Sequence, residues 1–133
     1  MSRRKLPYKV AVYGSLRKGL NNHPRLAKAK YIGNFKTKPS FTMYSLGPFP
    51  GVLPEGNTAI EIEVYEVEDE TTALGLDVLE GYNGEEHSDS NLYNVIDIDT
   101  EAGKTELYII NKKFLGDKKE VESGDWVEYL SNR

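Results

Sequence analysis

The sequence predicts one α+β domain, a mixed and curled β-sheet or barrel flanked by short helices, that spans residues 1–133. Several segments alternate like strands, whereas only two short segments have helical character. Two short helices are too few to cross over between parallel strands throughout, which argues against an all-parallel sheet. A chain of 133 residues with 38% hydrophobic content can bury one sizeable core but is too short for two typical domains.

The first half of the chain is expected to contain two strands and one short helix. A valine-rich alternation predicts a strand at residues 8–13, which ends at Gly14. Good helix formers predict a short helix at residues 24–30, after Asn22, which is able to cap it. A second strand is expected at residues 41–46.

Residues 47–57 (GPFPGVLPEGN) predict a loop, because the segment contains three prolines and three glycines. The apolar residues are Phe49, Val52 and Leu53, and surface loops are rarely so apolar. Two interpretations remain open. The segment is either a rigid lid that packs over a site or a β-turn excursion with one hydrophobic contact.

The second half of the chain is expected to contain three strands and a helix. Residues 58–67 (TAIEIEVYEV) predict a half-buried strand with its glutamates, among them Glu63, on the face opposite the aliphatic side chains. Residues 68–81 have acids in the first turn and a glycine at the end, which predicts a helix of about three turns. Strands are expected at residues 92–99 and 104–112, joined by an Ala-Gly hairpin.

The composition excludes several classes of function. The 17 basic and 21 acidic residues give a net charge of −4, which supplies no field that would concentrate nucleic acid. The absence of cysteine excludes disulfides, thiolate nucleophiles and cysteine-ligated metals. No apolar stretch approaches the roughly 20 residues that span a bilayer, and no signal-peptide core follows the basic residues of the expected flexible tail, residues 1–7. We therefore expect a cytoplasmic protein without nucleic-acid or membrane partners.

The stretch VYGSLRKG at residues 12–19 places a glycine and a hydroxyl where the first strand ends. Gly14 and Gly19 have the GxxxxG spacing of a phosphate-binding loop, but Leu20 and Asn21 stand where that motif needs Lys and Ser or Thr. The dinucleotide-binding motif GxGxxG does not occur either. The sequence therefore gives no sign of nucleotide hydrolysis or of a dinucleotide cofactor.

Ser15 is a poor candidate for a catalytic nucleophile. Its surroundings lack the second glycine of a GxSxG elbow, and only His23 and His87 could serve as its base. Each histidine is interpreted as a solvated loop residue, because no local spacing supplies the further ligands of a metal site. We expect no metal and no cofactor.

Glu80 is a stronger candidate for chemistry. In the expected helix, Ala73, Leu76 and Glu80 form one stripe, so a carboxyl occupies an apolar-facing position in the last turn. The helix dipole and partial burial would both raise the pKa of Glu80, which suits proton transfer near neutral pH. In the alternative interpretation the helix frays earlier and Glu80 points to water. Asp77 is the competing acid, nearer the edge of the stripe.

Five stretches together resemble the γ-glutamylcyclotransferase-like family, in the branch of small proteins that includes γ-glutamylamine cyclotransferases. They are VYGSLRKG at 12–19, FPGVL at 49–53, LDVLEGY at 76–82, LY at 92–93 and GDW at 124–126. Each stretch alone is weak evidence, but they occur in the family's order and cover most of the chain. The resemblance implies a mixed β-barrel flanked by helices.

The resemblance also implies the residues of the site. Glu80 takes the place of the family's catalytic acid-base. The substrate-binding positions that it implies are Tyr13, Gly14, Ser15, Leu16, Pro50, Gly51 and Tyr93. Trp126 of the GDW stretch is interpreted instead as an anchor for the C-terminal segment.

The activity implied by the resemblance is cyclisation of a small-molecule γ-glutamyl substrate to 5-oxoproline with release of an amine, by a monomer or weak homodimer. Two departures from the family pattern bear on this. Asn94 stands where an arginine often follows the tyrosine, and the segment 81–92 is long and acidic. These departures leave open a second class of function, a non-catalytic protein that binds a small molecule in the same pocket.

Overall fold

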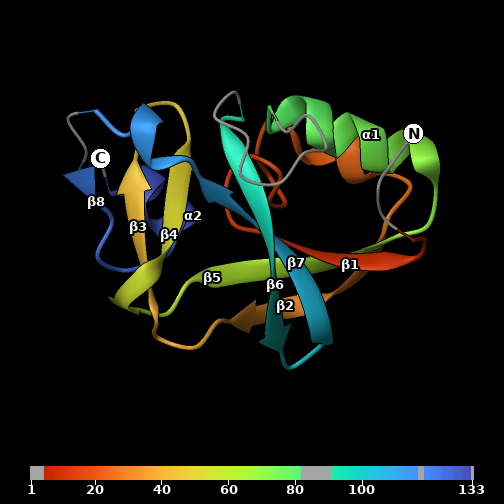
Figure 1. Cartoon of the computed structure of the whole chain (residues 1–133), viewed down its shortest axis with the longest axis horizontal. Coiled ribbons are helices and arrows are strands. Elements are labelled where there is room, and N and C mark those ends of the chain that lie inside the picture. Colours follow the sequence, from red (N-terminus) through yellow and green to blue (C-terminus); the bar gives the residue numbers. More distant parts are fainter. Residues whose placement is uncertain (1–4, 82–90, 117–118, 133) are drawn as a thin grey trace.

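The computed structural model describes residues 5–81, 91–116 and 119–132 (Figure 1). The elements are, in chain order, β1 (Tyr8–Val12), η1 (His23–Leu26), β2 (Lys30–Lys36), β3 (Phe41–Ser45), β4 (Pro50–Thr58), β5 (Glu61–Val67), α1 (Glu70–Leu79), β6 (Tyr93–Thr100), β7 (Gly103–Ile110), η2 (Lys112–Phe114), β8 (Lys119–Glu120) and α2 (Trp126–Ser131). The strands form a five-stranded sheet, in the order β2-β5-β1-β7-β6, and a three-stranded sheet, in the order β4-β3-β8.

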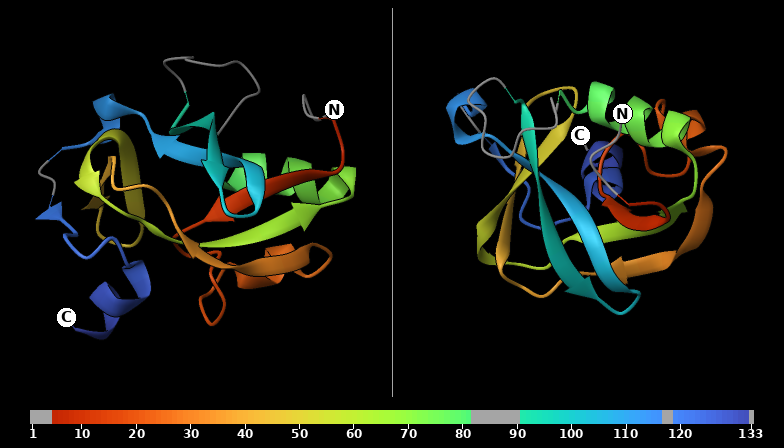
Figure 2. Two further views of the ribbon diagram at one scale, coloured as in Figure 1. Left: turned by 90° about the horizontal axis from the view of Figure 1, so that it is seen from below. Right: turned by 45° about the vertical axis from the view of Figure 1, so that its right-hand side comes forward.

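The five-stranded sheet is mixed, as the sequence predicts. Its central strand, β1, pairs antiparallel with β5 and parallel with β7, and β6 and β7 form the expected antiparallel hairpin. Helix α1 lies across this sheet, and α2 lies beside the three-stranded sheet (Figure 2). The two sheets do not join into one closed barrel within the described part of the chain, so the expected barrel is not confirmed.

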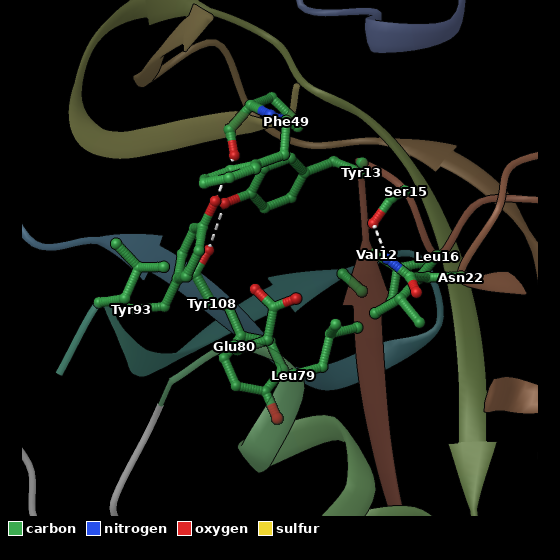
Figure 3. A pocket seen from close by; sticks show the side chains of 14 residues that line it. Val12, Tyr13, Ser15, Leu16, Asn22, Phe49, Leu79, Glu80, Tyr93 and Tyr108 are labelled. Carbon is green, nitrogen blue, oxygen red and sulfur yellow. Dashed lines mark hydrogen bonds between the residues drawn. The ribbon is translucent and has the colours of Figure 1, made fainter. Parts of the chain in front are cut away.

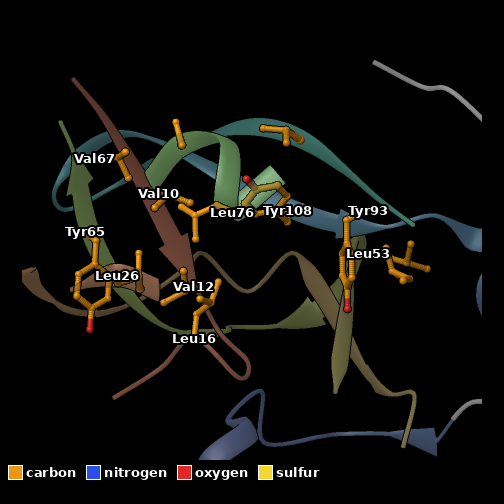
Figure 4. Close-up of a cluster of buried hydrophobic side chains, with 13 residues drawn as sticks. Val10, Val12, Leu16, Leu26, Leu53, Tyr65, Val67, Leu76, Tyr93 and Tyr108 are labelled. Atoms are coloured by element: carbon orange, nitrogen blue, oxygen red, sulfur yellow. The ribbon is translucent and has the colours of Figure 1, made fainter. Parts of the chain in front are cut away.

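Both faces of β1 are buried. Val10 and Val12 belong to one hydrophobic cluster with Leu76 of α1 (Figure 4). Ala11, on the opposite face, belongs to a second cluster that includes Trp126 of α2. Burial on both faces accounts for the nearly continuous apolar run of β1. The strand is therefore fixed by packing on two sides, and its end holds the loop that follows at a defined place in the molecule.

The prediction of a loop at residues 47–57 is wrong, because β4 covers most of that segment. β4 pairs with β3 and is an edge strand, so Pro50 and Pro54 need not donate hydrogen bonds to a neighbour. Gly51 lies so close to β7 that an added Cβ would stand 2.7 Å from the Cβ of Ile110. The prolines and glycines thus reflect an edge position and a close approach between strands. Neither the lid nor the turn interpretation holds.

The short helix expected at residues 24–30 is also wrong in extent. The segment forms only the 3₁₀ turn η1, in which Leu26 alone is buried, and residue 30 already begins β2. β2 is an edge strand whose residues are mostly exposed, so its sequence carries no alternation that would reveal it. The helix expected at residues 68–81 is confirmed as α1, which begins after Asp69, whose side chain accepts a hydrogen bond from the backbone N–H of Thr72.

The GDW stretch at residues 124–126 packs the C-terminal segment against the rest of the fold. Gly124 has φ +68°, and an added Cβ would lie 2.2 Å from the carbonyl oxygen of Ala59. Asp125 caps α2 by accepting a hydrogen bond from the N–H of Glu128, and the Trp126 side chain is 1% exposed. The interpretation of Trp126 as an anchor agrees with this burial. No helix in the described residues is long and apolar enough to cross a membrane.

Candidate active site

A pocket of about 180 Å³ opens where β1 ends, beside the C-terminal end of α1 (Figure 3). It is lined by Ala11, Val12, Tyr13, Gly14, Ser15, Leu16, Asn22, Phe49, Pro50, Leu79, Glu80, Leu92, Tyr93 and Tyr108. The pocket thus gathers stretches that are far apart in the sequence. Of the positions that the sequence analysis assigned to substrate binding or catalysis, all but Gly51 line it, and Gly51 instead packs against Ile110.

Glu80 projects its carboxyl into this pocket from the end of α1. Leu79 is the last helical residue, and Glu80 is the cap whose backbone N–H still bonds to the carbonyl of Leu76. The helix therefore ends before Glu80, as the alternative interpretation supposed. Its side chain nevertheless lies among pocket residues, close to Tyr13 and Tyr108 (Figure 3).

The environment of Glu80 favours its protonated form. Burial, followed by the nearby carboxylate of Asp77, raises the pKa of Glu80 from 4.5 to about 8. Among the hydrogen bonds and ion pairs within the described residues, none involves the Glu80 carboxyl, so no donor offsets this loss of hydration. A carboxyl in this state is suited to accept and return a proton near neutral pH.

Two tyrosines form a neutral wall beside Glu80. The Tyr13 hydroxyl donates to the carbonyl oxygen of Tyr108 at 2.7 Å, and the Tyr93 hydroxyl donates to the carbonyl oxygen of Pro50. Burial, with the nearby Glu80 carboxyl as a further cause, raises the pKa of both tyrosines well above their usual value. Both hydroxyls therefore stay protonated and hold the strands around the pocket together. The Tyr93 hydroxyl is already engaged, so what Tyr93 presents to the pocket is mainly its ring.

The loop after β1 presents backbone donors at the pocket. It turns tightly, since the N–H of Arg17 bonds to the carbonyl of Gly14 and the N–H of Asn22 bonds to the carbonyl of Ser15. Within the described part of the chain, no hydrogen bond is recorded from the N–H groups of Ser15 and Leu16, although both residues line the pocket. These two N–H groups are available to an anion or a developing oxyanion.

Within the part of the chain that the structure describes, Ser15 has no catalytic base. Its hydroxyl accepts a hydrogen bond from the Asn22 side chain at 2.8 Å, whereas His23 Nδ1 lies 3.0 Å from the carbonyl oxygen of Leu16 and His23 does not line the pocket. His87, the other histidine considered, lies outside the described residues. No cluster of three or more His, Asp or Glu side chains that could hold a metal occurs in residues 5–81, 91–116 and 119–132.

An ion-pair network around Arg17 anchors the loop that follows β1. Arg17, which is 7% exposed, donates from Nε to Glu63 at 3.0 Å and from Nη1 to Asp125 at 2.9 Å. Glu63 also accepts hydrogen bonds from the N–H of Lys18 and the hydroxyl of Tyr65. Glu63 thus lies on the face opposite Ile62 and Val64, as predicted, but that face is not open to solvent at this point, because Glu63 is buried as the counter-charge of Arg17.

Gly14 lies where the loop meets β4. An added Cβ at this position would stand 2.9 Å from both Cγ and Cδ of Pro50, which is closer than real Cβ atoms approach other groups. Gly14 is thus required by the contact between two walls of the pocket. Its role as a point of close substrate approach stays a proposal.

Gly14→Ala is expected to lower stability by about 1–3 kcal/mol, the usual cost of inserting a methyl group into a packed site. It should also lower activity more than Ser15→Ala does, because it displaces the loop backbone, whereas Ser15→Ala removes only the hydroxyl bonded to Asn22. Denaturant unfolding and turnover of both variants measure this order. Greater loss of activity in Ser15→Ala would point to a chemical role for its hydroxyl.

Seven of the lining residues were not anticipated as site residues: Ala11, Val12, Asn22, Phe49, Leu79, Leu92 and Tyr108. Val12, Phe49, Leu79 and Leu92 lie within stretches that the sequence analysis singled out, and Ala11 and Asn22 lie close to the stretch at 12–19, so these stretches were the available signal. Tyr108 lies inside an expected strand without any motif, and nothing in the sequence shows that its ring meets the end of α1.

The fold and the pocket together define a small α+β protein in which the carboxyl of Glu80 and backbone donors meet in the same pocket, the class of site that suits acid-base chemistry on a small molecule. Residues 10–128 match the family described as gamma-glutamyl cyclotransferase, AIG2-like. The chain belongs to this family. Membership supports activity of the gamma-glutamylcyclotransferase kind and does not favour a non-catalytic binding protein.

Individual relatives agree with this assignment over nearly the whole chain. A protein of Vibrio cholerae is 37% identical over 119 residues, which span 90% of this chain and 95% of the relative. The gamma-glutamylcyclotransferase family protein YtfP of Escherichia coli K12 is 34% identical over 120 residues, 90% of this chain and 96% of its own. The crystal structure of an uncharacterised protein from Pyrococcus horikoshii superposes with a TM-score of 0.74 at 29% identity and covers 94% of each chain.

Proposed function

We propose that this protein is a γ-glutamyl cyclotransferase that converts a γ-glutamyl amine to 5-oxoproline and the free amine, with Glu80 as general acid-base. The observation that carries the proposal is the unpaired Glu80 carboxyl, whose pKa is raised to about 8, in the same pocket as the N–H groups of Ser15 and Leu16. The reaction needs one proton carrier and one oxyanion site, and these groups are able to supply both.

The ring closes by intramolecular attack. The α-amine of the substrate attacks its own γ-glutamyl carbonyl carbon, the new C–N bond completes a five-membered ring, and the C–N bond to the amine then breaks. No nucleophile from the protein is required. Intramolecular attack from a well-oriented pose is worth up to roughly 7–11 kcal/mol in ideal cases, so folding the substrate in a small pocket is a large part of the catalysis.

Glu80 moves one proton in two steps. The ionised carboxylate first accepts the proton that the α-ammonium must lose, and the protonated carboxyl then donates it to the departing amine. The second proton that the ring nitrogen loses as it becomes the lactam N–H passes to the released amine, which leaves as an ammonium. The raised pKa of about 8 brings Glu80 nearer to the pKa of the substrate α-ammonium than an ordinary carboxyl would be, so proton transfer between them is less unfavourable. The carbonyl oxygen, which becomes negative during attack, accepts hydrogen bonds from the N–H groups of Ser15 and Leu16.

The experiment that tests the proposal is incubation with a panel of γ-glutamyl amines, γ-glutamyl amino acids and ε-(γ-glutamyl)lysine, with detection of 5-oxoproline. The expected result is stoichiometric release of 5-oxoproline and free amine from at least one class of compound, without added metal or cofactor. Saturable binding of these compounds without any product would overturn the proposal in favour of a binding protein.

The pH dependence of the reaction follows from the raised pKa. Because the ionised form of Glu80 accepts the proton, and its pKa is about 8, kcat/KM should fall about tenfold per pH unit below pH 8. The measurement is kcat/KM between pH 5 and pH 9 with a buffer series of constant ionic strength. A profile that stays flat down to pH 5 would show that the essential base has an ordinary carboxyl pKa, contrary to this proposal.

A further inference from the structure

Asp77 is a buried acid that the proposed reaction does not use. It lies on α1, three residues before Glu80, is 8% exposed and does not line the pocket. Its Oδ1 accepts a hydrogen bond of 2.7 Å from the hydroxyl of Tyr108. The sequence analysis placed Asp77 near the edge of the apolar stripe, but the structure buries it more deeply than Glu80.

The position of Asp77 matters because Glu80, the cap of α1, follows it by three positions, close to the spacing at which helical neighbours lie side by side with Cβ atoms roughly 5–6 Å apart. A negative charge at that separation, away from water, disfavours the ionised form of the Glu80 carboxyl. The partner of Asp77, Tyr108, also forms part of the pocket wall, and its backbone carbonyl holds the Tyr13 hydroxyl. One residue of β7 thus fixes both the acid behind Glu80 and the tyrosine in front of it.

The other described elements around Glu80 bring no cationic side chain into the pocket lining. The titratable groups that face it are Tyr13 after β1, Tyr93 of β6 and Tyr108 of β7, and the pocket lining within the described residues contains no Lys, Arg or His. Burial keeps Tyr13 and Tyr93 in their neutral forms. Among the groups that border Glu80, Asp77 is therefore the charge that acts on it.

We propose that Asp77 is a positioning residue that acts through Glu80: the Tyr108 hydroxyl holds the Asp77 carboxylate one helical turn behind Glu80, where its charge keeps the Glu80 proton in place until a cation enters the pocket. This proposal rests on the proposed function for its kinetic consequence only. When the substrate ammonium binds, its positive charge opposes that of Asp77. Glu80 then ionises in the complex, as the base must.

The direct test is the titration of Glu80 in the substrate-free protein, followed by carbon-13 NMR of glutamate side-chain carboxyls and assigned with Glu80→Gln. Asp77→Asn keeps an oxygen that can accept from Tyr108 but removes the charge, so the Glu80 midpoint should move to lower pH. The matched control is Glu70→Gln, which removes one negative charge from the first turn of the same helix and should leave the midpoint unchanged. Asp77→Ser serves if Asp77→Asn does not fold.

The part played by Tyr108 is tested by a double-mutant cycle. In a Tyr108→Phe background the Asp77 carboxylate loses its tether, so Asp77→Asn should move the Glu80 midpoint by less than it does in the wild type. An undiminished shift would remove Tyr108 from the proposal. An unchanged Glu80 midpoint in both Asp77 variants, or an equal shift in Glu70→Gln, would overturn the role of Asp77 itself.

Kinetics then separate this inference from the proposed function. If the protein forms 5-oxoproline, the acid limb of the kcat/KM profile should move to lower pH in Asp77→Asn, while Glu70→Gln keeps the wild-type profile. If no product forms, the proposed function fails, yet the NMR titration still decides the inference. Conversely, product formation together with an Asp77-independent titration leaves the proposed function standing and overturns the inference alone.

Discussion

Replacing Glu80 by glutamine is expected to lower kcat by about two orders of magnitude or more, the usual contribution of a positioned acid-base group. Glutamine keeps the size of the side chain and its place at the end of α1, but it cannot accept the proton of the substrate ammonium. The measurement is the rate of 5-oxoproline formation at saturating substrate. Near-normal turnover in Glu80→Gln would transfer the role to another group and refute the assignment.

Stability supplies an independent check on the same variant. The pKa of Glu80 rises from 4.5 to about 8 on folding, so the folded protein binds the proton more tightly than the unfolded chain. The stability that this proton contributes is fully present below about pH 4.5 and is lost as the pH rises through about 8. Glutamine does not titrate. Glu80→Gln should therefore gain melting temperature relative to the wild type between pH 5 and pH 9, and a constant difference would contradict the raised pKa.

Replacing Trp126 by alanine is expected to lower the free energy of unfolding by about 3–5 kcal/mol, the range for truncation of a large aromatic side chain in a packed core. Trp126 is 1% exposed and stacks on Tyr129 with ring centroids 5.1 Å apart. It contributes to the cluster between the sheets and does not line the pocket. Denaturant unfolding measures the loss, and kcat/KM of the fraction that remains folded should stay close to that of the wild type.

The matched comparison for Trp126→Ala is Tyr93→Phe, which removes one hydroxyl from a pocket residue. That hydroxyl donates to the carbonyl of Pro50, so its loss should cost about 0.5–1.5 kcal/mol of stability and loosen the contact between β6 and β4. Tyr93→Phe should lower kcat/KM more than Trp126→Ala does. A stable but inactive Trp126→Ala beside a fully active Tyr93→Phe would place the functional site at the C-terminal end of the fold.

The sequence was informative where one element decides the position of a side chain. The period of two at residues 58–67 predicted a strand, and the helical stripe that includes Leu76 predicted that Glu80 would face inward. Both follow from geometry within a single strand or helix. The structure places Glu80 in the pocket, although the helix itself ends one residue earlier.

The sequence was misleading where contacts between distant segments decide the burial of a side chain or the structure of a segment. Glu63 fits the polar side of its strand, but it is buried because Arg17, 46 residues away in the chain, becomes its partner. The prolines and glycines of residues 47–57 indicated a loop because an edge strand that approaches β7 closely needs the same residue types. No local pattern distinguishes these cases, since the information lies in which elements pair.

The ion pair between Arg17 and Asp125 also bears on how the protein folds during synthesis. The two residues are separated by 108 positions, so the loop after β1 leaves the ribosome long before its last partner does. β1 likewise cannot complete its pairing until β7, its parallel neighbour, has been synthesised. Because such distant contacts form slowly, we expect residues 13–18 to remain accessible to proteases in nascent chains that stop before residue 125. The loop that lines the pocket is thus synthesised early but gains its last stabilising contact late.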